Sequence, residues 1–169
     1  MNKIVLPFIA MLGFLFAGCG PTAPKYIAQT PQSYTYSYSG TVAHPFEWYE
    51  TEKGEDGTMH LLYSSQGQPE IYIYRLPEDA METIGAIVRE ARLWKLQSSY
   101  RPDFEILDGY GWHVSIFYED GYVASGGSNA WPSGDLWKGI NDINTYLKGI
   151  IEAAGEEGII GTTTHFDRR

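Results

Sequence analysis

The residues best suited to metal chemistry are few in this chain of 169 residues. It holds one cysteine, Cys19, and four histidines, His44, His60, His113 and His165. None stands at a spacing typical of a metal site, so a zinc site requires His60 and His113 to lie on neighbouring strands with an acidic residue beside them. Both alternate out of phase with the apolar residues around them, which predicts the solvent side of a strand. We expect no metal and no cofactor.

Hydroxyl and carboxylate groups also lack a pattern that predicts catalysis. Ser125-Gly126-Gly127-Ser128 has neither the Gly-x-Ser-x-Gly spacing of a nucleophile turn nor the glycine and lysine spacing of a phosphate loop. Asp103, Glu105 and Asp108 are candidate calcium ligands in one predicted loop, but they lack the spacing of a known calcium loop. The sequence predicts no catalytic residues.

Aromatic residues are the most distinctive part of the composition, with 13 tyrosines and 5 tryptophans. Such rings suit half-buried strands, and they also stack on sugar rings or grip a peptide. We expect most of them to pack inside the domain. The candidates for a ligand surface are Trp131, Asn129, Trp48, Tyr34, Tyr36 and Tyr38.

Trp131 has the most informative position among these candidates. It lies in a glycine-rich loop between the last predicted hairpin and the last predicted helix, and Pro132 biases its backbone towards an extended conformation. A tryptophan there either closes the end of the core beneath Leu136 and Ile140 or points outward to meet a ligand. We favour the buried position, because burying such a ring contributes several kcal/mol and needs no ligand to explain it.

The N-terminal residues carry a different chemistry. Lys3 precedes an uncharged and mostly apolar run over residues 4–16, and Phe16-Ala17-Gly18-Cys19 follows. A run of about thirteen residues suits a signal-peptide core and is shorter than the roughly 20 residues of a membrane-spanning helix. This stretch resembles the signal peptide of bacterial lipoproteins. The resemblance implies cleavage before Cys19 and attachment of diacylglycerol to its thiol.

The same resemblance carries expectations about location. Gly20, where an aspartate commonly marks inner-membrane retention, implies the periplasmic face of the outer membrane in a Gram-negative source. In a Gram-positive source the anchor is the outer leaflet of the plasma membrane. The mature chain has no second cysteine, so its fold rests on packing without a disulfide.

The net charge of the chain restricts the classes of partner that it is expected to bind. The formal net charge is −9, and removing residues 1–18 takes away Lys3 and no acidic residue, which leaves −10. An acidic protein without a basic stripe is repelled by nucleic acid and by anionic head groups. We therefore exclude nucleic-acid binding and expect the membrane contact to come from the lipid on Cys19. An envelope protein, a peptide or a glycan remains as a partner.

The elements that position these residues follow from the apolar pattern. Residues 19–32 are proline-rich and read as a flexible tether, residues 33–154 as one globular domain, and residues 155–169 as a flexible C-terminal tail. Alternating residues predict strands, and two apolar stripes predict helices. One helix starts at Pro77, and the other carries a stripe from Leu136 to Ala154 with Ser133 or Asp135 as its cap. The order ββββ-α-ββ-α predicts an α+β fold of two layers, an antiparallel sheet of about six strands with two helices packed on one face.

One internal segment adds a second resemblance. Residues 108–132 contain Asp-Gly-Tyr-Gly-Trp, then Tyr-Glu-Asp-Gly, then Ser-Gly-Gly-Ser-Asn-Ala-Trp-Pro. This segment resembles bacterial secreted and lipoprotein domains of no assigned activity, and it implies no site residues. The sequence therefore predicts a lipid-anchored cell-envelope protein, with a non-enzymatic binding or interaction module favoured. An envelope hydrolase of unassigned type and a purely structural envelope component are the alternatives.

Overall fold

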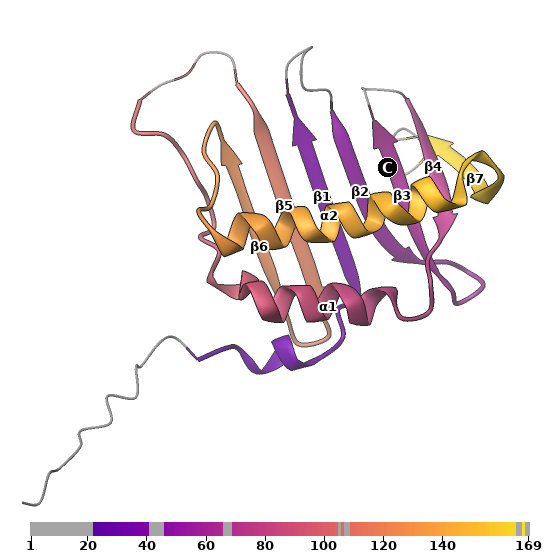
Figure 1. Cartoon of the computed structure of the whole chain (residues 1–169), viewed down its shortest axis with the longest axis horizontal. Coiled ribbons are helices and arrows are strands. Elements are labelled where there is room, and N and C mark those ends of the chain that lie inside the picture. Colours follow the sequence, from indigo (N-terminus) through magenta and orange to yellow (C-terminus); the bar gives the residue numbers. More distant parts are fainter. Residues whose placement is uncertain are drawn as a thin grey trace, which may run out of the picture.

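The structure is a computed structural model in which one antiparallel sheet is covered on one face by two α-helices (Figure 1). It describes residues 22–40, 46–65, 69–104, 106, 109–164 and 167. The predicted α+β class and the position of both helices on one face are confirmed. Several residues of interest lie outside the described part of the chain, namely Cys19 with the whole signal segment, His44, Glu105, Asp108 and His165.

The sheet has seven strands, one more than predicted, in the order β6-β5-β1-β2-β3-β4-β7. Neighbouring strands all pair antiparallel. The first four form a meander, and the β5–β6 hairpin then adds to the free side of β1. The strands are β1 (Ser33–Ser39), β2 (Glu47–Lys53), β3 (Met59–Ser65), β4 (Glu70–Arg75), β5 (Gly111–Tyr118), β6 (Gly121–Ser128) and β7 (Ile159–Thr164).

The extra strand corrects the prediction of a flexible C-terminal tail. β7 pairs with β4 along its length, with Thr163 opposite Ile71 and Thr162 opposite Tyr72. Five of its six residues are isoleucine or threonine, the β-branched types that favour strands. A second correction concerns β6, which continues to Ser128 through part of the predicted glycine-rich loop.

Two helices, α1 (Ala80–Ala91) and α2 (Asp135–Ala154), cross the strands and connect distant parts of the sheet (Figure 1). α1 leads from β4 to β5 over four strand spacings, about 19 Å, and its 12 residues span about 18 Å. α2 leads from one edge strand to the other over six spacings, about 29 Å, and its 20 residues span about 30 Å. The helix lengths therefore match the sheet that they cross. No helix in the described ranges is long and apolar enough to span a membrane.

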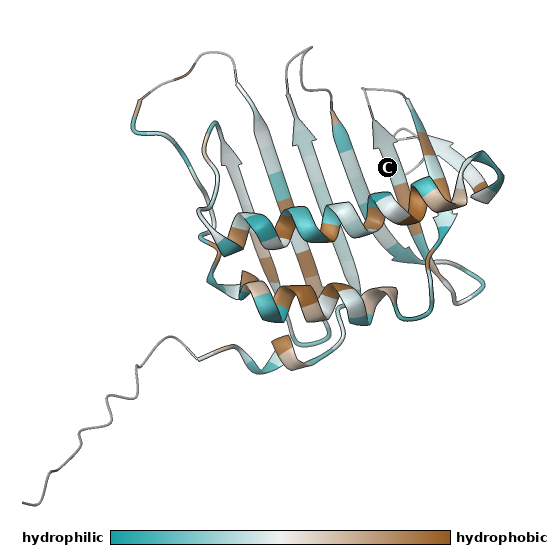
Figure 2. Cartoon of the chain, viewed as in Figure 1, coloured by the Kyte–Doolittle hydropathy of each residue, from teal (hydrophilic) through white to brown (hydrophobic). Residues whose placement is uncertain are grey.

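The core lies between the helices and the sheet. Figure 2 shows the most hydrophobic residues on the helices and on the strand segments that they cross, whereas the ends of β5 and β1 beyond α2 are paler. The Tyr34 hydroxyl donates a hydrogen bond of 2.6 Å to Asn144 Oδ1, which ties β1 to α2. A side chain on Gly139 would collide with Ala91, so glycine permits the close approach of α2 to α1. The fully buried aliphatic side chains include Leu61, Ile84, Val88, Val114, Ile116, Ile140, Ile143 and Leu147.

The N-terminal segment is bound to the domain before β1 begins. Residues Lys25–Ala28 form a short 3-10 helix, and the Ile27 side chain is buried. The Tyr26 hydroxyl donates to the backbone oxygen of Tyr122, and Arg89 of α1 donates to the Ile27 oxygen. This part of the predicted tether therefore packs against α1 and the β5–β6 hairpin.

Candidate functional site

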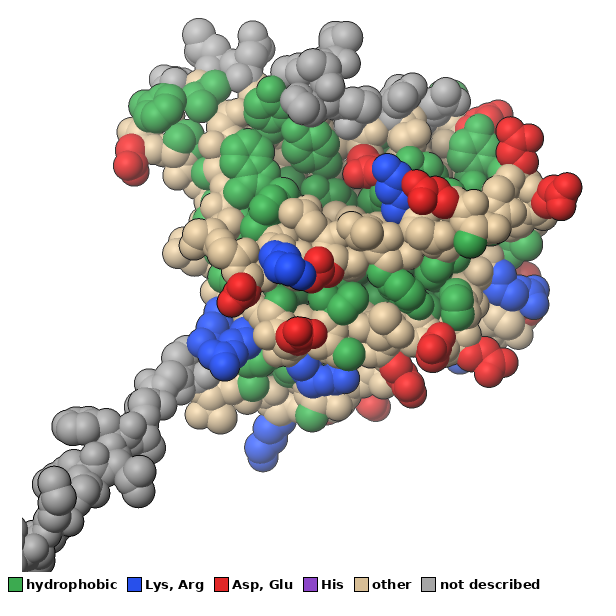
Figure 3. All heavy atoms as spheres, in the orientation of Figure 1, with side chains coloured by type: hydrophobic (Ala, Val, Ile, Leu, Met, Phe, Trp, Pro, Cys, Tyr) green, Lys and Arg blue, Asp and Glu red, His purple; other side chains and the backbone are tan. Residues whose placement is uncertain are grey.

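The helices leave one end of the covered sheet face open. α1 lies over the end of the sheet where β1 begins, and α2 crosses near the middle (Figure 1). Figure 3 shows hydrophobic side chains gathered on this face, on the side of α2 that is away from α1. At this end of the sheet β1, β3 and β6 end, and β2, β4 and β5 begin.

Four connected aromatic side chains, which we call the aromatic surface, lie at this end: Tyr38, Tyr110, Trp131 and Trp137. The Tyr38 and Tyr110 rings are stacked, with centroids 6.1 Å apart and planes inclined by 18°. Trp131 lies 6.2 Å from Tyr110 and 6.3 Å from Trp137, measured between ring centroids. Trp131 is 39% exposed and the other three are partly exposed. The rings come from β1, from the residue before β5, from the β6–α2 loop and from the first turn of α2.

Asn129 holds Tyr110 in place. Its backbone N–H donates to the Tyr110 oxygen at 2.9 Å, and its side-chain Oδ1 accepts from the Tyr110 N–H at 3.0 Å. Its φ of 52° lies in the left-handed region, which asparagine tolerates better than most residues. Asn129 is a sequence candidate for ligand binding, and the structure gives it this positioning contact.

Trp112, rather than Trp131, closes the core beneath the aromatic surface. Its ring is 4% exposed, and its indole N–H donates to the Ala130 oxygen at 2.7 Å. Its ring centroid lies 5.5 Å from Trp137 and 5.8 Å from Tyr100. The expectation that Trp131 is the buried residue is therefore wrong, because Trp112 already fills the space under the loop and leaves Trp131 at the surface.

A row of tyrosines, in which Tyr36 and Tyr49 are buried and Tyr63 is partly buried, continues the aromatic surface across the sheet. The Tyr36 and Tyr49 ring centroids are 6.3 Å apart, and Tyr49 and Tyr63 are 5.2 Å apart. The Tyr49 hydroxyl donates to Glu47 Oε1 at 2.6 Å. Burial, reinforced by the Glu47 carboxylate, raises the pKa of Tyr36 and of Tyr49 well above the usual range. Both phenols therefore stay protonated.

A polar pocket adjoins the aromatic surface on the side of the 98–110 connection. Its volume is about 510 Å³, within the range of about 300–1,000 Å³ of small-molecule sites. Asn129 is shared, because it lines the pocket and also holds Tyr110. The other lining residues are Arg101, Pro102, Asp103, Phe104, Ile106 and Ser128. Among the described residues, the lining thus has one cationic and one anionic side chain, two neutral polar side chains and three apolar ones.

Three of the predicted ligand-binding residues lie elsewhere. Tyr34 and Tyr36 are 0% and 4% exposed, respectively. Both are therefore core residues on the sheet face that α2 crosses. Trp48 lies on the opposite face of the sheet, because its neighbour Tyr49 pairs with Tyr36 on the helix-covered face and successive residues alternate. Only Tyr38 and Trp131 of the predicted aromatic candidates belong to the aromatic surface.

The strand order separates the two histidines of the zinc alternative. His60 is on β3 and His113 is on β5, and the strands β1 and β2 lie between β3 and β5. The zinc alternative requires the two histidines to be on neighbouring strands, and they are not. Within the described residues, no group of three histidine, cysteine, aspartate or glutamate side chains is close enough to hold a metal ion. Two of the three candidate calcium ligands, Glu105 and Asp108, lie outside the described residues.

The closest approach to a catalytic geometry is a small cluster at the β2–β3 turn. The Thr58 hydroxyl lies 3.0 Å from His60 Nε2 and 2.7 Å from Asp56 Oδ1. In a catalytic triad the acid and the nucleophile contact different nitrogens of the histidine ring. Here Asp56 contacts the threonine directly and lies 3.6 Å from the same Nε2. The hydrogen bonds from Thr58 lower the pKa of Asp56, and the cluster stabilises the turn.

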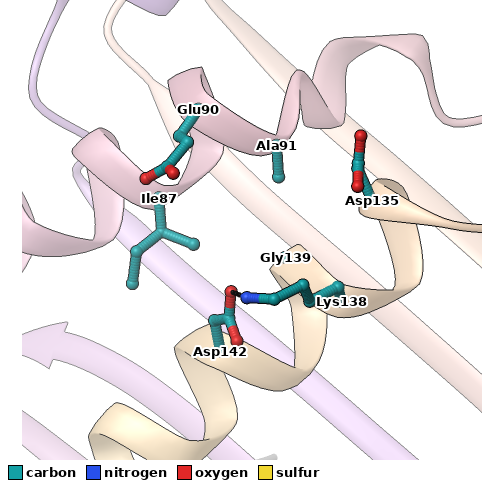
Figure 4. Close-up of a pocket in the computed structure, with 7 residues that line it drawn as sticks. All are labelled: Ile87, Glu90, Ala91, Asp135, Lys138, Gly139 and Asp142. Carbon is teal, nitrogen blue, oxygen red and sulfur yellow. Dashed lines mark hydrogen bonds and ion pairs between the residues drawn. The ribbon is translucent and has the colours of Figure 1, made fainter.

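A second cavity lies between the two helices and has a volume of about 350 Å³ (Figure 4). Its charged residues are Glu90, Asp135, Lys138 and Asp142. Lys138 Nζ is 2.6 Å from Asp142 Oδ2, and this hydrogen bond raises the pKa of the lysine. The Lys138–Asp142 pair is exposed, and the cavity is an open notch above the contact between Gly139 and Ala91. We therefore place the functional site at the aromatic surface.

Comparison with known proteins adds no assignment. No protein-family model matches the chain, and no curated protein matches it.

Two members of the aromatic surface are missed from the sequence. Tyr110 continues the two-residue alternation of Trp112 and Val114, so its face is readable although it lies before the predicted strand. Trp137 lies beside the apolar stripe of α2 and carries no signal of its own. The pairing of β5 with β1 brings Tyr110 next to Tyr38, and Trp137 of α2 packs against Trp112 of β5.

Proposed function

We propose that this protein is a lipid-anchored component of the bacterial cell envelope that binds a ligand through its aromatic surface. The observation that carries the proposal is the connected set of four partly exposed rings next to a polar pocket. Soluble proteins rarely leave large contiguous apolar areas exposed unless they bind something there. The N-terminal resemblance to lipoproteins supports the location.

A binding role is favoured over hydrolysis by the chemistry of this end of the sheet. The described residues of the aromatic surface and the polar pocket include no histidine and no cysteine that could act as base or nucleophile. The serine of the pocket, Ser128, has the Asn129 amide as its hydrogen-bond partner at 3.4 Å. A purely structural role gives no reason for Trp131 to be 39% exposed among other rings.

Photocrosslinking in cells tests the binding surface whatever the identity of the ligand. We expect a photoreactive phenylalanine analogue in place of Trp131 to give a crosslinked product of higher mass in intact cells. The matched control places the same analogue at Trp48, which is on the opposite face of the sheet. Equal products from both positions, or none from position 131, would show that the aromatic surface does not bind an envelope component.

Fatty-acid labelling tests the anchor. Cys19→Ala is expected to abolish incorporation of labelled palmitate and to leave an uncleaved precursor in the membrane fraction, because the thiol that receives the lipid is gone. Wild-type protein serves as the positive control. Palmitate incorporation into the Cys19→Ala protein would refute the lipoprotein assignment.

A further inference from the structure

We infer that the ligand of the aromatic surface is an uncharged glycan, whose sugar rings lie on the aromatic rings and whose hydroxyls enter the polar pocket. This inference rests on the proposed function and specifies the class of ligand.

The first argument is the spacing and exposure of the rings. A pyranose ring has faces covered by C–H groups and a rim of hydroxyls, so an exposed aromatic ring binds it by its face. The Tyr38, Tyr110, Trp131 and Trp137 centroids follow one another at 6.1, 6.2 and 6.3 Å. These steps are comparable with the length of one sugar unit. Neighbouring ring planes are inclined by 18°, 49° and 68°. A chain of sugars can therefore contact successive members of the aromatic surface partly by ring faces and partly by ring edges.

The second argument is the polar chemistry next to the rings. A sugar hydroxyl both donates and accepts, so a site for it needs groups of both kinds. Arg101 supplies donors, Asp103 supplies acceptors, and the Asn129 amide supplies both. Among the described lining residues, the one cation and the one anion balance in charge. The protein as a whole has a formal charge of −9, which disfavours an anionic polymer.

The third argument concerns backbone hydrogen bonds, on which an extended peptide depends. Peptides commonly add to a sheet through the free edge of a strand. The aromatic surface lies on a sheet face, where β1 is paired on both sides by β5 and β2. The nearest edge strand, β6, is already bridged at this end, because Tyr100 N–H donates to the Gly126 oxygen and Ser128 N–H donates to the Tyr100 oxygen. A peptide therefore cannot add to the sheet here as a further strand, whereas a glycan needs no strand edge.

Calorimetry with defined oligosaccharides tests this inference. The protein is the mature chain, residues 19–169 with Cys19→Ser, which lacks the lipid. The uncharged probes are hexasaccharides of β-1,4-glucose, β-1,4-N-acetylglucosamine, β-1,4-mannose and α-1,4-glucose. The other probes are an anionic oligogalacturonate, a proline-rich decapeptide and a lysine-rich decapeptide. We expect at least one uncharged hexasaccharide to bind and to change the tryptophan fluorescence, and the other three probes not to bind.

Variants then locate the binding. Trp131→Ala and Tyr38→Ala are each expected to weaken the affinity by about tenfold, which corresponds to about 1.4 kcal/mol for the loss of one stacking ring. Arg101→Ala tests the pocket and is expected to weaken the affinity without removing a ring. Trp48→Ala, on the opposite face, is expected to bind as the parent chain does. The melting temperature of each variant shows whether it is folded.

The outcomes separate this inference from the proposed function. Binding of no uncharged probe, or binding that a folded Trp131→Ala variant retains in full, would overturn the glycan assignment. Peptide binding that is lost in Trp131→Ala would also overturn it, yet would leave the aromatic surface as a binding site. If position 131 gives no crosslinked product and no probe binds, both the glycan assignment and the proposed binding function are overturned.

Discussion

Replacing Trp112 with alanine is expected to lower the free energy of unfolding by about 3–5 kcal/mol, the usual cost of truncating a buried aromatic residue. The ring is 4% exposed and fills the space between the β6–α2 loop and the start of α2. Its removal also leaves the Ala130 oxygen without the indole N–H that now lies 2.7 Å away. At about 2–4 °C per kcal/mol, the melting temperature should fall by on the order of 10 °C.

The matched control for this variant is Trp131→Ala. It removes the same side chain from the same region, but Trp131 is 39% exposed, so much less apolar area leaves the interior. Thermal unfolding followed by circular dichroism should show a decrease for Trp131→Ala of less than half of that for Trp112→Ala. Equal decreases would mean that Trp131, and not Trp112 alone, closes the core.

Truncation of the mature chain after Gly155 is expected to destabilise the domain by several kcal/mol. It removes β7 and with it the backbone ladder to β4, in which five residue pairs are aligned. A net contribution of about 0.5–1.5 kcal/mol for each of roughly five hydrogen bonds gives a loss of about 2.5–7.5 kcal/mol. The truncation also exposes the edge of β4 beside Ile71, which is fully buried in the complete chain. The melting temperature should again fall by on the order of 10 °C.

A chain that ends after Thr164 is the control for this truncation. It keeps the whole of β7 and gives up only the hydrogen bonds between Thr164 and Asp167 among the described contacts. We expect it to melt within a few degrees of the complete chain. If the chain that ends at Gly155 also melts within a few degrees of the complete chain, residues 156–169 contribute no strand and form a flexible tail, as the sequence predicts.

The sequence predicts the local elements of this fold well and the long-range pairing poorly. Alternation in Tyr34–Tyr36–Tyr38 and in Trp112–Val114–Ile116 is a property of each strand by itself, so both strands are predictable. That β1 pairs with β5 depends on α1, which carries the chain back over the sheet. β7 has the composition of a strand, but Gly161 and three consecutive threonines give no alternation of apolar and polar residues.

The candidate site shows the same division. From the sequence, a ligand surface of aromatic residues is the less favoured interpretation and Trp131 is expected to be buried, yet Tyr38 and Trp131 both lie at the aromatic surface. Which tryptophan is buried is not predictable, because Trp112 and Trp131 compete for one space and only the assembled β5–β6 hairpin decides between them. Strand periodicity places Tyr36 on the same face as Tyr38. Its burial depends on where α2 crosses that face.

Lys25–Ala28 packs against α1 and the β5–β6 hairpin. This packing determines how far the domain can lie from a lipid on Cys19. Between Cys19 and Lys25 lie only residues 20–24, a stretch that spans on the order of 20 Å at full extension. In the lipid-anchored state that we propose, this short stretch would hold the α1 end of the domain close to the bilayer. The aromatic surface lies at the other end of β1 and would then face away from that membrane. A copy anchored in this way would meet targets in the envelope space rather than targets on its own bilayer.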